Sequence, residues 1–255
     1  MRTIAFLYGL VSYAVFLVSF LGAVAFVGDL VPAIPISVDR GPDAPLALAL
    51  AIDSALLGLF AVQHSVMARP AFKRAWTRII SPAIERSTYV LLSSLVLLLM
   101  LVEWRPIPGV LWDAGNGALG LALRGGQWLG WLVVLLSTFM LSHFDLFGLK
   151  QVYAHLRERA HEDPGFRTPF LYRLVRHPIM LGFLIAFWVT PVMTLGHLVF
   201  ALATTGYIVI ALRFEEADLV RAHGNAYRDY QAKVPMLLPL PKSGGNAGSA
   251  QKQAI

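Results

Sequence analysis

Two clusters of ionisable residues lie in the C-terminal half of the chain and bracket an apolar hairpin. Arg176-His177-Pro178 begins one apolar segment, and Glu215-Glu216 ends the next. If these segments are antiparallel helices that turn near Leu195-Gly196, His177 lies 18 residues before the turn and Glu215 lies 19 residues after it. At a rise of about 1.5 Å per residue, both lie roughly 27 Å from the turn, at the same membrane face. The spacing therefore predicts a pocket that holds a cation and an acid together at a lipid–water boundary.

The local sequence around His177 supports an anion-binding role for the first cluster. Pro178 fits the first position of a helix and biases the preceding residue away from helical geometry, so His177 resembles an N-cap residue. The free N–H groups of such a helix start favour a negatively charged group. A purely structural alternative stays open, in which Arg176 and Glu215 form a salt bridge across the hairpin and Glu216 is solvated.

The composition around this hairpin is that of an integral membrane protein. Apolar residues make up 57% of the chain and charged residues 14%, with a mean hydropathy of +0.64; soluble domains contain about 25% charged residues. The predicted spans are Ile4–Val27, Leu46–Met67, Tyr89–Glu103, Gln127–Phe147, Pro178–Met193 and Gly196–Leu212. The last two are shorter than the roughly 20 residues that cross a bilayer, so they are either tilted or a shallow re-entrant pair. We expect an all-α polytopic helical bundle with five to six transmembrane helices, whose C-terminal hairpin carries the site.

The basic residues of the loops predict the orientation of these spans. The loop after the second span contains Arg69, Lys73, Arg74, Arg78 and Arg86, and the loop after the fourth contains Lys150, Arg157, Arg159, Arg167, Arg173 and Arg176. Both loops are therefore predicted to be cytoplasmic, as are both termini. The net charge of +6 suits an anionic membrane surface. Nucleic acid is not expected as a partner because no zinc-finger or helix-turn-helix pattern is present, and no obligate protein partner is evident.

The segments outside the spans read as connections rather than as a second domain. Residues 1–242 are predicted to form a single membrane domain, and residues 243–255, rich in Gly, Ser, Ala and Gln, a disordered tail. Ala68–Ser87 interleaves aromatic and basic residues, which predicts a short interfacial helix. The chain has no cysteine, which excludes disulfides, thiolate metal sites and a cysteine nucleophile.

Several ionisable residues interrupt the apolar spans, at a cost of about 2.5–3.5 kcal/mol for a charge near the bilayer centre. His64, His143 and Asp145 lie near the predicted cytoplasmic ends of their spans, and we expect them to converge on the hairpin site as catalytic candidates. Interhelical hydrogen bonding is the structural alternative. A site with two histidines and one carboxylate is a third, but separate helices supply the residues and we assign no metal. Asp53 and His197 lie toward the outer face, where a structural role is expected.

The C-terminal signature resembles that of membrane-integral S-adenosylmethionine methyltransferases, which include isoprenylcysteine carboxyl methyltransferase and the phospholipid methyltransferases. The matching residues are Leu171-Tyr172-Arg173-Leu174-Val175-Arg176-His177-Pro178, Glu215-Glu216, His223-Gly224, Tyr227, Tyr230 and Val234-Pro235. The resemblance implies S-adenosylmethionine as cofactor. It implies a cofactor site made of Tyr172, Arg176, His177, Pro178, Glu215 and Glu216. One departure is that Ile179 and Met180 stand where the family usually has a tyrosine shortly after the proline.

Further segments are similar to one branch, the bacterial methanethiol S-methyltransferases, which make dimethyl sulfide. They include Gln63-His64-Ser65-Val66-Met67-Ala68 and Ser142-His143-Phe144-Asp145-Leu146-Phe147-Gly148. This resemblance implies a small volatile thiol as acceptor and the bacterial inner membrane as location. The first segment also resembles nurim, a nuclear-envelope membrane protein without a settled activity. An isoprenylcysteine or phospholipid methyltransferase and a non-catalytic nurim-like scaffold therefore remain alternatives; a channel or transporter is disfavoured because the outer half of the spans is almost wholly apolar.

Transfer to a thiol would place two demands on the site. A thiol attacks as its thiolate, so a nearby base helps, and His177 is one candidate. A small acceptor needs a tight and dry pocket. The bulky rings expected to crowd it are Phe144, Phe147, Phe183, Phe187 and Trp188.

Overall fold

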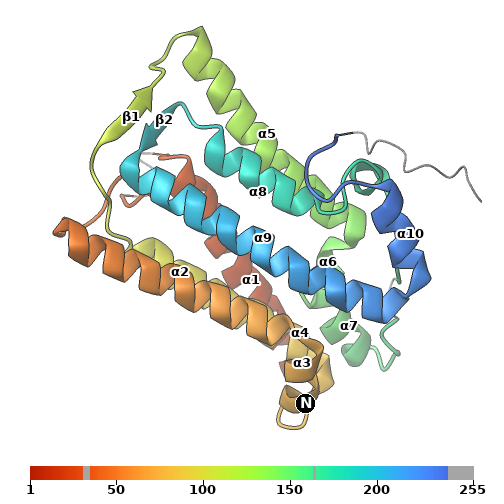
Figure 1. Cartoon of the computed structure of the whole chain (residues 1–255). Coiled ribbons are helices and arrows are strands. Elements are labelled where there is room, and N and C mark those ends of the chain that lie inside the picture. Colours follow the sequence, from red (N-terminus) through yellow and green to blue (C-terminus); the bar gives the residue numbers. More distant parts are fainter. Residues whose placement is uncertain (31–34, 163–164, 241–255) are drawn as a thin grey trace, which may run out of the picture.

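The computed structural model describes residues 1–30, 35–162 and 165–240 as a bundle of helices (Figure 1). Five helices in these ranges are long and apolar enough to cross a membrane: α1 (Arg2–Val27), α2 (Leu46–Ala68), α4 (Pro82–Glu103), α5 (Ala118–Leu141) and α9 (Leu195–His223). The shorter elements are α3 (Pro70–Trp76), α6 (His143–Leu146), α7 (Leu149–Leu156), a 3₁₀ helix (Phe170–Arg173), α8 (Pro178–Trp188), α10 (Asn225–Lys233) and two short strands, β1 (Val110–Asp113) and β2 (Val192–Thr194). The chain is thus an all-α polytopic membrane protein. The predicted tail at 243–255 lies outside the described residues, and the single domain at 1–242 stays a prediction.

The fifth predicted span differs most from the structure. Helix α8 has only 11 residues, about 16 Å of rise against a hydrocarbon core of about 30 Å. The chain then runs through β2, which pairs antiparallel with β1. This pairing supplies hydrogen-bond partners to backbone that a longer helix would have satisfied internally. Pro178–Met193 is therefore not one transmembrane helix.

Three other helix boundaries also differ from the predicted ones. Helix α5 covers Ala118–Leu141 instead of ending at Phe147, because Ser142 adopts a left-handed backbone conformation with φ 94°. Helix α4 begins at Pro82, after the Ser81 side chain caps its first turn, so the interfacial helix is only α3. Helix α9 continues past Leu212 to His223, which places both glutamates inside a helix.

Both ends of the described chain lie at one end of the bundle. Arg2 forms an ion pair with Glu158, just after α7. The Tyr172 hydroxyl donates to the Ser137 carbonyl near the end of α5, at 3.4 Å. At the opposite end lie the two strands, where the Thr194 hydroxyl donates to Asp39. Because both ends lie together, the chain crosses the bundle an even number of times. The five long helices make five crossings, and α8 together with β2 makes the sixth.

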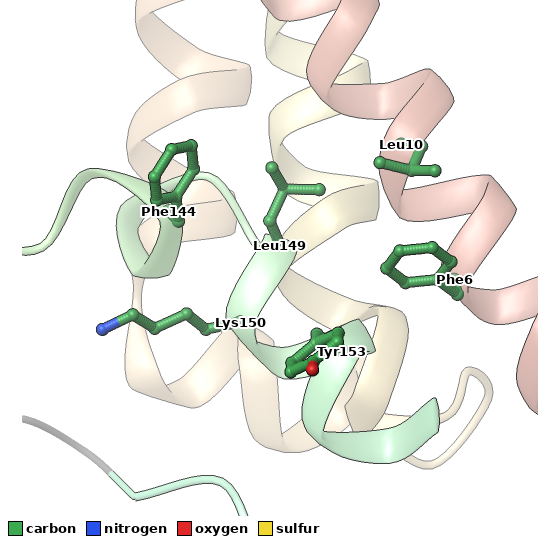
Figure 2. A pocket seen from close by; sticks show the side chains of 6 residues that line it. All are labelled: Phe6, Leu10, Phe144, Leu149, Lys150 and Tyr153. Atoms are coloured by element: carbon green, nitrogen blue, oxygen red, sulfur yellow. The ribbon is translucent and has the colours of Figure 1, made fainter. Parts of the chain in front are cut away.

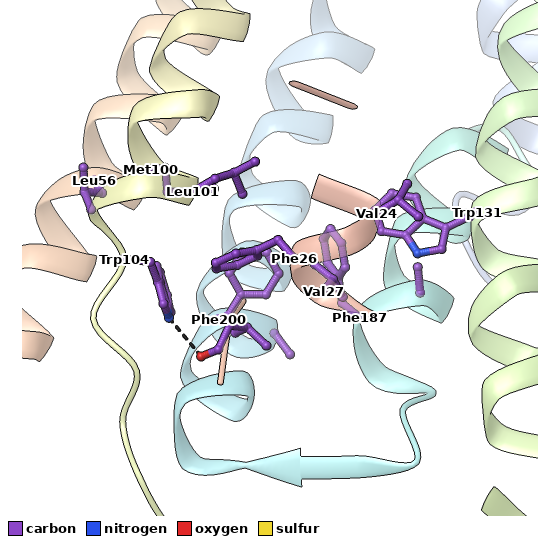
Figure 3. Close-up of a cluster of buried hydrophobic side chains, with 13 residues drawn as sticks. Val24, Phe26, Val27, Leu56, Met100, Leu101, Trp104, Trp131, Phe187 and Phe200 are labelled. Atoms are coloured by element: carbon purple, nitrogen blue, oxygen red, sulfur yellow. Dashed lines mark hydrogen bonds between the residues drawn. The ribbon is translucent and has the colours of Figure 1, made fainter. Parts of the chain in front are cut away.

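An aromatic core near the strands fixes α8 and α9 in place (Figure 3). Phe187 lies edge-on to Phe200 at 5.0 Å and to Trp131 at 6.0 Å. Trp104 donates from Nε1 to the Val38 carbonyl at 3.1 Å. Phe183 and Trp188 pack against the same cluster. Three of the rings expected to crowd the hairpin site therefore belong to the core at the other end of α8.

Helix α8 is also held against α5 along its length, and the two lie side by side in Figure 1. A Cβ atom added at Gly130 would lie 2.6 Å from the Ala186 backbone nitrogen, and one added at Gly182 would lie 2.7 Å from the Gly130 carbonyl oxygen. Small residues at such contacts let helix backbones approach closely in membranes. This contact fixes the position at which α8 presents its first residues.

Candidate active site

The hairpin brings the two ionisable clusters together, as their spacing predicts. His177 is the N-cap residue of α8 and Pro178 is the first helical residue. The His177 Nε2 atom lies 3.1 Å from Glu216 Oε1, and its Nδ1 atom lies 4.0 Å from Glu215 Oε2. Arg176 donates from Nε to Glu216 Oε1 at 2.5 Å. A cation and two carboxylates therefore meet at one end of the bundle.

Glu216 is the hub of this cluster. Besides Arg176 and His177, it accepts hydrogen bonds from Gln231 Nε2 at 3.1 Å and from the Tyr227 hydroxyl at 3.5 Å. Its side chain is 14% exposed and that of Arg176 is 8% exposed. The structural alternative from the sequence is thus wrong in its partner, because Arg176 pairs with Glu216 and the neighbouring glutamate is the solvated one.

Arg176 also fastens the segment that follows α10. Its Nη1 atom donates to the Val234 carbonyl at 2.6 Å and to the Gln231 carbonyl at 3.2 Å. The backbone N–H groups of Arg176 and His177 donate to the carbonyls of Pro235 and Met236. Within the described ranges, Nη2 has no protein hydrogen bond, which leaves one edge of the guanidinium for an anionic ligand.

Glu215 differs from its neighbour in having acceptor capacity to spare. Its side chain is 45% exposed, and its contact in the described part of the chain is the one with His177. Its negative charge contributes to the raised pKa of Tyr172 and of Tyr227. An exposed carboxylate with open acceptor positions suits a ligand that has an ammonium group and sugar hydroxyls.

The phenols around the hairpin cluster are set as hydrogen-bond donors. Burial, and then the Glu215 carboxylate, raises the pKa of Tyr172 well above its ordinary value. Burial raises the pKa of Tyr230 to about 12. Burial, and then the Glu216 carboxylate, also raises the pKa of Tyr227. Tyr230 donates to the Tyr172 carbonyl at 2.5 Å, so these rings join α10 to the 3₁₀ helix that precedes α8.

His64 lies beside Tyr89, a residue that was not predicted as a site residue. Its Nε2 atom lies 2.9 Å from the Tyr89 hydroxyl, and its Nδ1 atom lies 3.3 Å from the Ser93 hydroxyl. Neither His64 nor Tyr89 contacts the hairpin cluster in the described ranges, so the predicted convergence of His64 stays a prediction. The available sequence signal was the spacing of Tyr89 and Ser93, which are four residues apart and share one face of α4.

His143 and Asp145 form a separate cluster. The His143 ring nitrogens lie 2.8 Å from the Tyr13 hydroxyl and 2.9 Å from the Thr138 hydroxyl. Asp145 accepts from Gln151 at 2.7 Å and faces His161 at 3.2 Å. These bonds tie α1, α5 and α7 together. The predicted convergence of His143 and Asp145 on the hairpin finds no contact in the part of the chain described.

The same described ranges contain no group of three His, Asp or Glu side chains placed to hold a metal ion. Asp53 and His197 have structural partners, as expected for them. Asp53 accepts from the Arg105 backbone at 2.9 Å, and His197 lies 2.8 Å from the Phe187 carbonyl.

Among the cavities formed by the described residues, two open on the sides of the bundle. The first, about 200 Å³, lies between α2 and α9 and is lined by Ser65, Val66, Arg69, Ala211 and Phe214. The second, about 270 Å³, lies against α1, α6 and α7 and is lined by Phe6, Leu10, Phe144, Leu149, Lys150 and Tyr153 (Figure 2). The first begins beside a residue of the hairpin cluster, because Phe214 directly precedes Glu215.

Comparison with known proteins gives relatives over nearly the whole chain. A methanethiol S-methyltransferase of Mycobacterium tuberculosis is 55% identical over 94% of this chain and 98% of its own length. Methanethiol S-methyltransferase 2 of Bradyrhizobium diazoefficiens is 54% identical over 93% of this chain and 91% of its own length. The chain belongs to the methanethiol S-methyltransferase family. It is therefore an enzyme of the methyltransferase class.

This family has a more distant relative outside bacteria. Nurim of Rattus norvegicus is 31% identical over 79% of this chain and 78% of its own length. No family model matches the chain, and no solved structure does. The resemblance of the sequence to methanethiol S-methyltransferases, with nurim further away, is thus confirmed by the comparisons.

Proposed function

We propose that this chain transfers a methyl group from S-adenosylmethionine to methanethiol and forms dimethyl sulfide. The observation that carries the proposal is the exposed Glu215 carboxylate beside the buried Arg176–Glu216 pair. It lies in a chain that is 55% identical to a protein named for methanethiol methylation. The residues fit the donor, because a carboxylate, a free guanidinium edge and several phenols match its ammonium, carboxylate and hydroxyl groups.

We assign the donor site to Tyr172, Arg176, His177, Pro178, Glu215 and Glu216. Glu215 accepts from the ammonium group or the ribose hydroxyls, while the free edge of Arg176 and the N–H groups at the start of α8 hold the carboxylate. Glu216 and Pro178 keep these groups in place. When bound, the donor supplies an electrophilic methyl group. The protein contributes positioning and exclusion of water, which an in-line displacement mainly requires.

The candidate bases divide between two roles. His177 lies between two carboxylates and holds the donor site together. His64 is hydrogen-bonded to Tyr89 and contacts neither glutamate in the described ranges, so we place it on the acceptor side. For His143 and Asp145 we propose a structural role, since their hydrogen bonds stay among α1, α5 and α7.

The direct test uses purified protein, S-adenosylmethionine and a panel of acceptors, with thioether products measured by gas chromatography. We expect turnover of methanethiol and other short alkyl thiols, and little turnover of prenylcysteine or phosphatidylethanolamine. Robust prenylcysteine methylation without methanethiol turnover would overturn the acceptor while keeping the donor. Absence of transfer to every acceptor would favour the scaffold role that the likeness to nurim raises.

We further propose that the protein lies in the bacterial inner membrane with both termini in the cytoplasm. The basic loops at Ala68–Ser87 and Lys150–Arg176 lie at the same end of the bundle as Arg2 and α10, as the positive-inside rule requires. A reporter that is active only in the cytoplasm is expected to work when fused after Ile255. Activity there of a reporter that works only in the periplasm would reverse the assignment.

A further inference from the structure

A group of polar side chains lies between the membrane-spanning helices α2 and α4. His64 contacts both Tyr89 and Ser93, and Gln63 donates to Ser93 at 3.2 Å. Polar and ionisable residues in transmembrane helices are costly, and they usually mark a functional path rather than packing. None of these four residues forms a hydrogen bond with the Arg176–Glu216 pair in the ranges described. The role of the group must therefore be explained separately.

In this group the Tyr89 hydroxyl can donate one hydrogen bond to His64, and its oxygen can still accept another. His64 stacks on Phe60, with ring centroids 5.1 Å apart and an interplanar angle of 19°. This packing places the Tyr89 oxygen 2.9 Å from Nε2 and 3.2 Å from Nδ1 of the imidazole. When the phenol donates to Nε2, its oxygen retains lone pairs for a second proton. The pair is thus arranged to pass a proton from the Tyr89 side to His64.

This pair lies near a cavity at the side of the bundle. The Ser65 hydroxyl donates to Tyr207 at 3.3 Å, at the wall of the cavity between α2 and α9. That cavity is otherwise lined mainly by apolar side chains, of which Val66 and Phe214 are exposed on the outside of the bundle. His64 does not line this cavity, but Phe60, which stacks on His64, lies edge-on to Tyr207 with ring centroids 6.2 Å apart. A small apolar thiol dissolved in the bilayer therefore has a place to enter one side chain away from His64.

His177 is less suited to accept a proton. Both of its nitrogens face carboxylates, at 3.1 Å and 4.0 Å, so the ring is already engaged in holding the two glutamates. The neighbours of His64 are instead two hydroxyl groups and an aromatic ring. No acid touches it among the described residues, so its neutral ring is free to accept.

We propose that Tyr89 and His64 form the base that takes the proton from the acceptor thiol, which rests on the proposed function above. The S–H bond breaks and its proton passes to the Tyr89 oxygen, while the Tyr89 proton passes to His64 Nε2. The electron pair left on sulfur forms the new bond to the methyl carbon. The pair of the broken methyl bond stays on the sulfur of the donor, which becomes an uncharged thioether. His64 then loses its extra proton to water.

The test compares two acceptors of nearly the same size, methanethiol and methaneselenol. The selenol is the stronger acid and is already ionised at neutral pH, so it needs no base. In Tyr89→Phe and His64→Gln, we expect kcat/KM for methanethiol to fall by about 100-fold, as for other general bases, and that for methaneselenol to fall by less than about three-fold. Affinity for S-adenosylmethionine, measured by calorimetry, should stay unchanged.

Tyr8→Phe is the matched control, because the Tyr8 hydroxyl also makes one hydrogen bond to α4, at Thr88 and 3.0 Å. It should leave both acceptors unaffected. Equal losses of thiol and selenol turnover in Tyr89→Phe would assign Tyr89 a structural role and overturn the proposal, as would full methanethiol turnover in both variants. Failure of the proposed function would look different, since the unaltered protein would then methylate neither acceptor.

Discussion

Replacing Glu216 by Gln is expected to lower the free energy of unfolding by about 3 kcal/mol, the usual size when a buried ion pair loses one partner. Glu216 accepts from Arg176, His177, Tyr227 and Gln231, and its substitution leaves a guanidinium that is only 8% exposed without a counter-charge. Glutamine keeps the size of the side chain, so the loss reports the charge and its hydrogen bonds rather than a cavity. Titration with denaturant in detergent, followed by tryptophan fluorescence, measures the effect.

The adjacent glutamate supplies the control for this measurement. Glu215→Gln is the same chemical change one residue earlier in α9, at a side chain that is 45% exposed. Substitutions at exposed sites usually change stability by less than about 0.5 kcal/mol. Equal destabilisation by the two substitutions would contradict the assignment of Glu216 as the hub.

A local consequence separates loss of the hub from general destabilisation. The N–H groups of Arg176 and His177 donate to the carbonyls of Pro235 and Met236, and the Arg176 guanidinium secures the same segment. In Glu216→Gln these two amides should exchange hydrogen faster than amides in the aromatic core around Trp131. Uniform acceleration across both regions would instead point to global opening.

Residue counts correctly predicted that the two ionisable clusters meet, although one of the two helices is shorter than predicted. The count assumed two helices of similar rise, whereas α8 ends at Trp188 and an extended stretch follows. An extended residue advances about 3.3 Å against about 1.5 Å for a helical one. The few residues up to β2 therefore make up the length that the short helix lacks, and His177 still lies level with the glutamates.

The choice between the two glutamates was not predictable in this way. Consecutive residues of a helix point about 100° apart, so one of them must face the Arg176 side and the other must turn away. The rotation of α9 about its axis decides which, and contacts distant in sequence set that rotation, such as the ion pair from Arg69 to Asp218 at 2.7 Å. The structural alternative drawn from the sequence paired Arg176 with Glu215, whereas the structure pairs it with Glu216.

The same limit explains the different positions of the histidines. His64 and His143 both lie near the expected cytoplasmic ends of apolar segments, and composition alone does not distinguish them. In the structure, α2 turns His64 toward Tyr89 on α4, while the left-handed Ser142 ends α5 and leaves His143 against Tyr13 on α1. Which neighbour a polar side chain meets depends on helix packing, which no local pattern records.

Glu215→Gln is expected to weaken binding of S-adenosylmethionine by about ten-fold or more while leaving stability intact. A charge-assisted hydrogen bond is worth roughly 1.5–3 kcal/mol. Partial exposure of this carboxylate screens the interaction, so we take the lower end, and about 1.4 kcal/mol corresponds to ten-fold in affinity. Calorimetry on the purified protein measures the change directly and needs no acceptor.

Glu103→Gln provides a control of similar exposure, 47% against 45%, at the opposite end of the bundle. Its donor affinity should match that of the unaltered protein. Unchanged affinity in a folded Glu215→Gln variant would remove Glu215 from the donor site. The group with open hydrogen-bonding capacity would then be the free edge of Arg176, and donor recognition would have to rest on the carboxylate end of the ligand. The expected pair of results is weaker donor binding with normal stability in Glu215→Gln and lower stability in Glu216→Gln. That pair of results would mean that Glu215 binds the donor and Glu216 stabilises the fold.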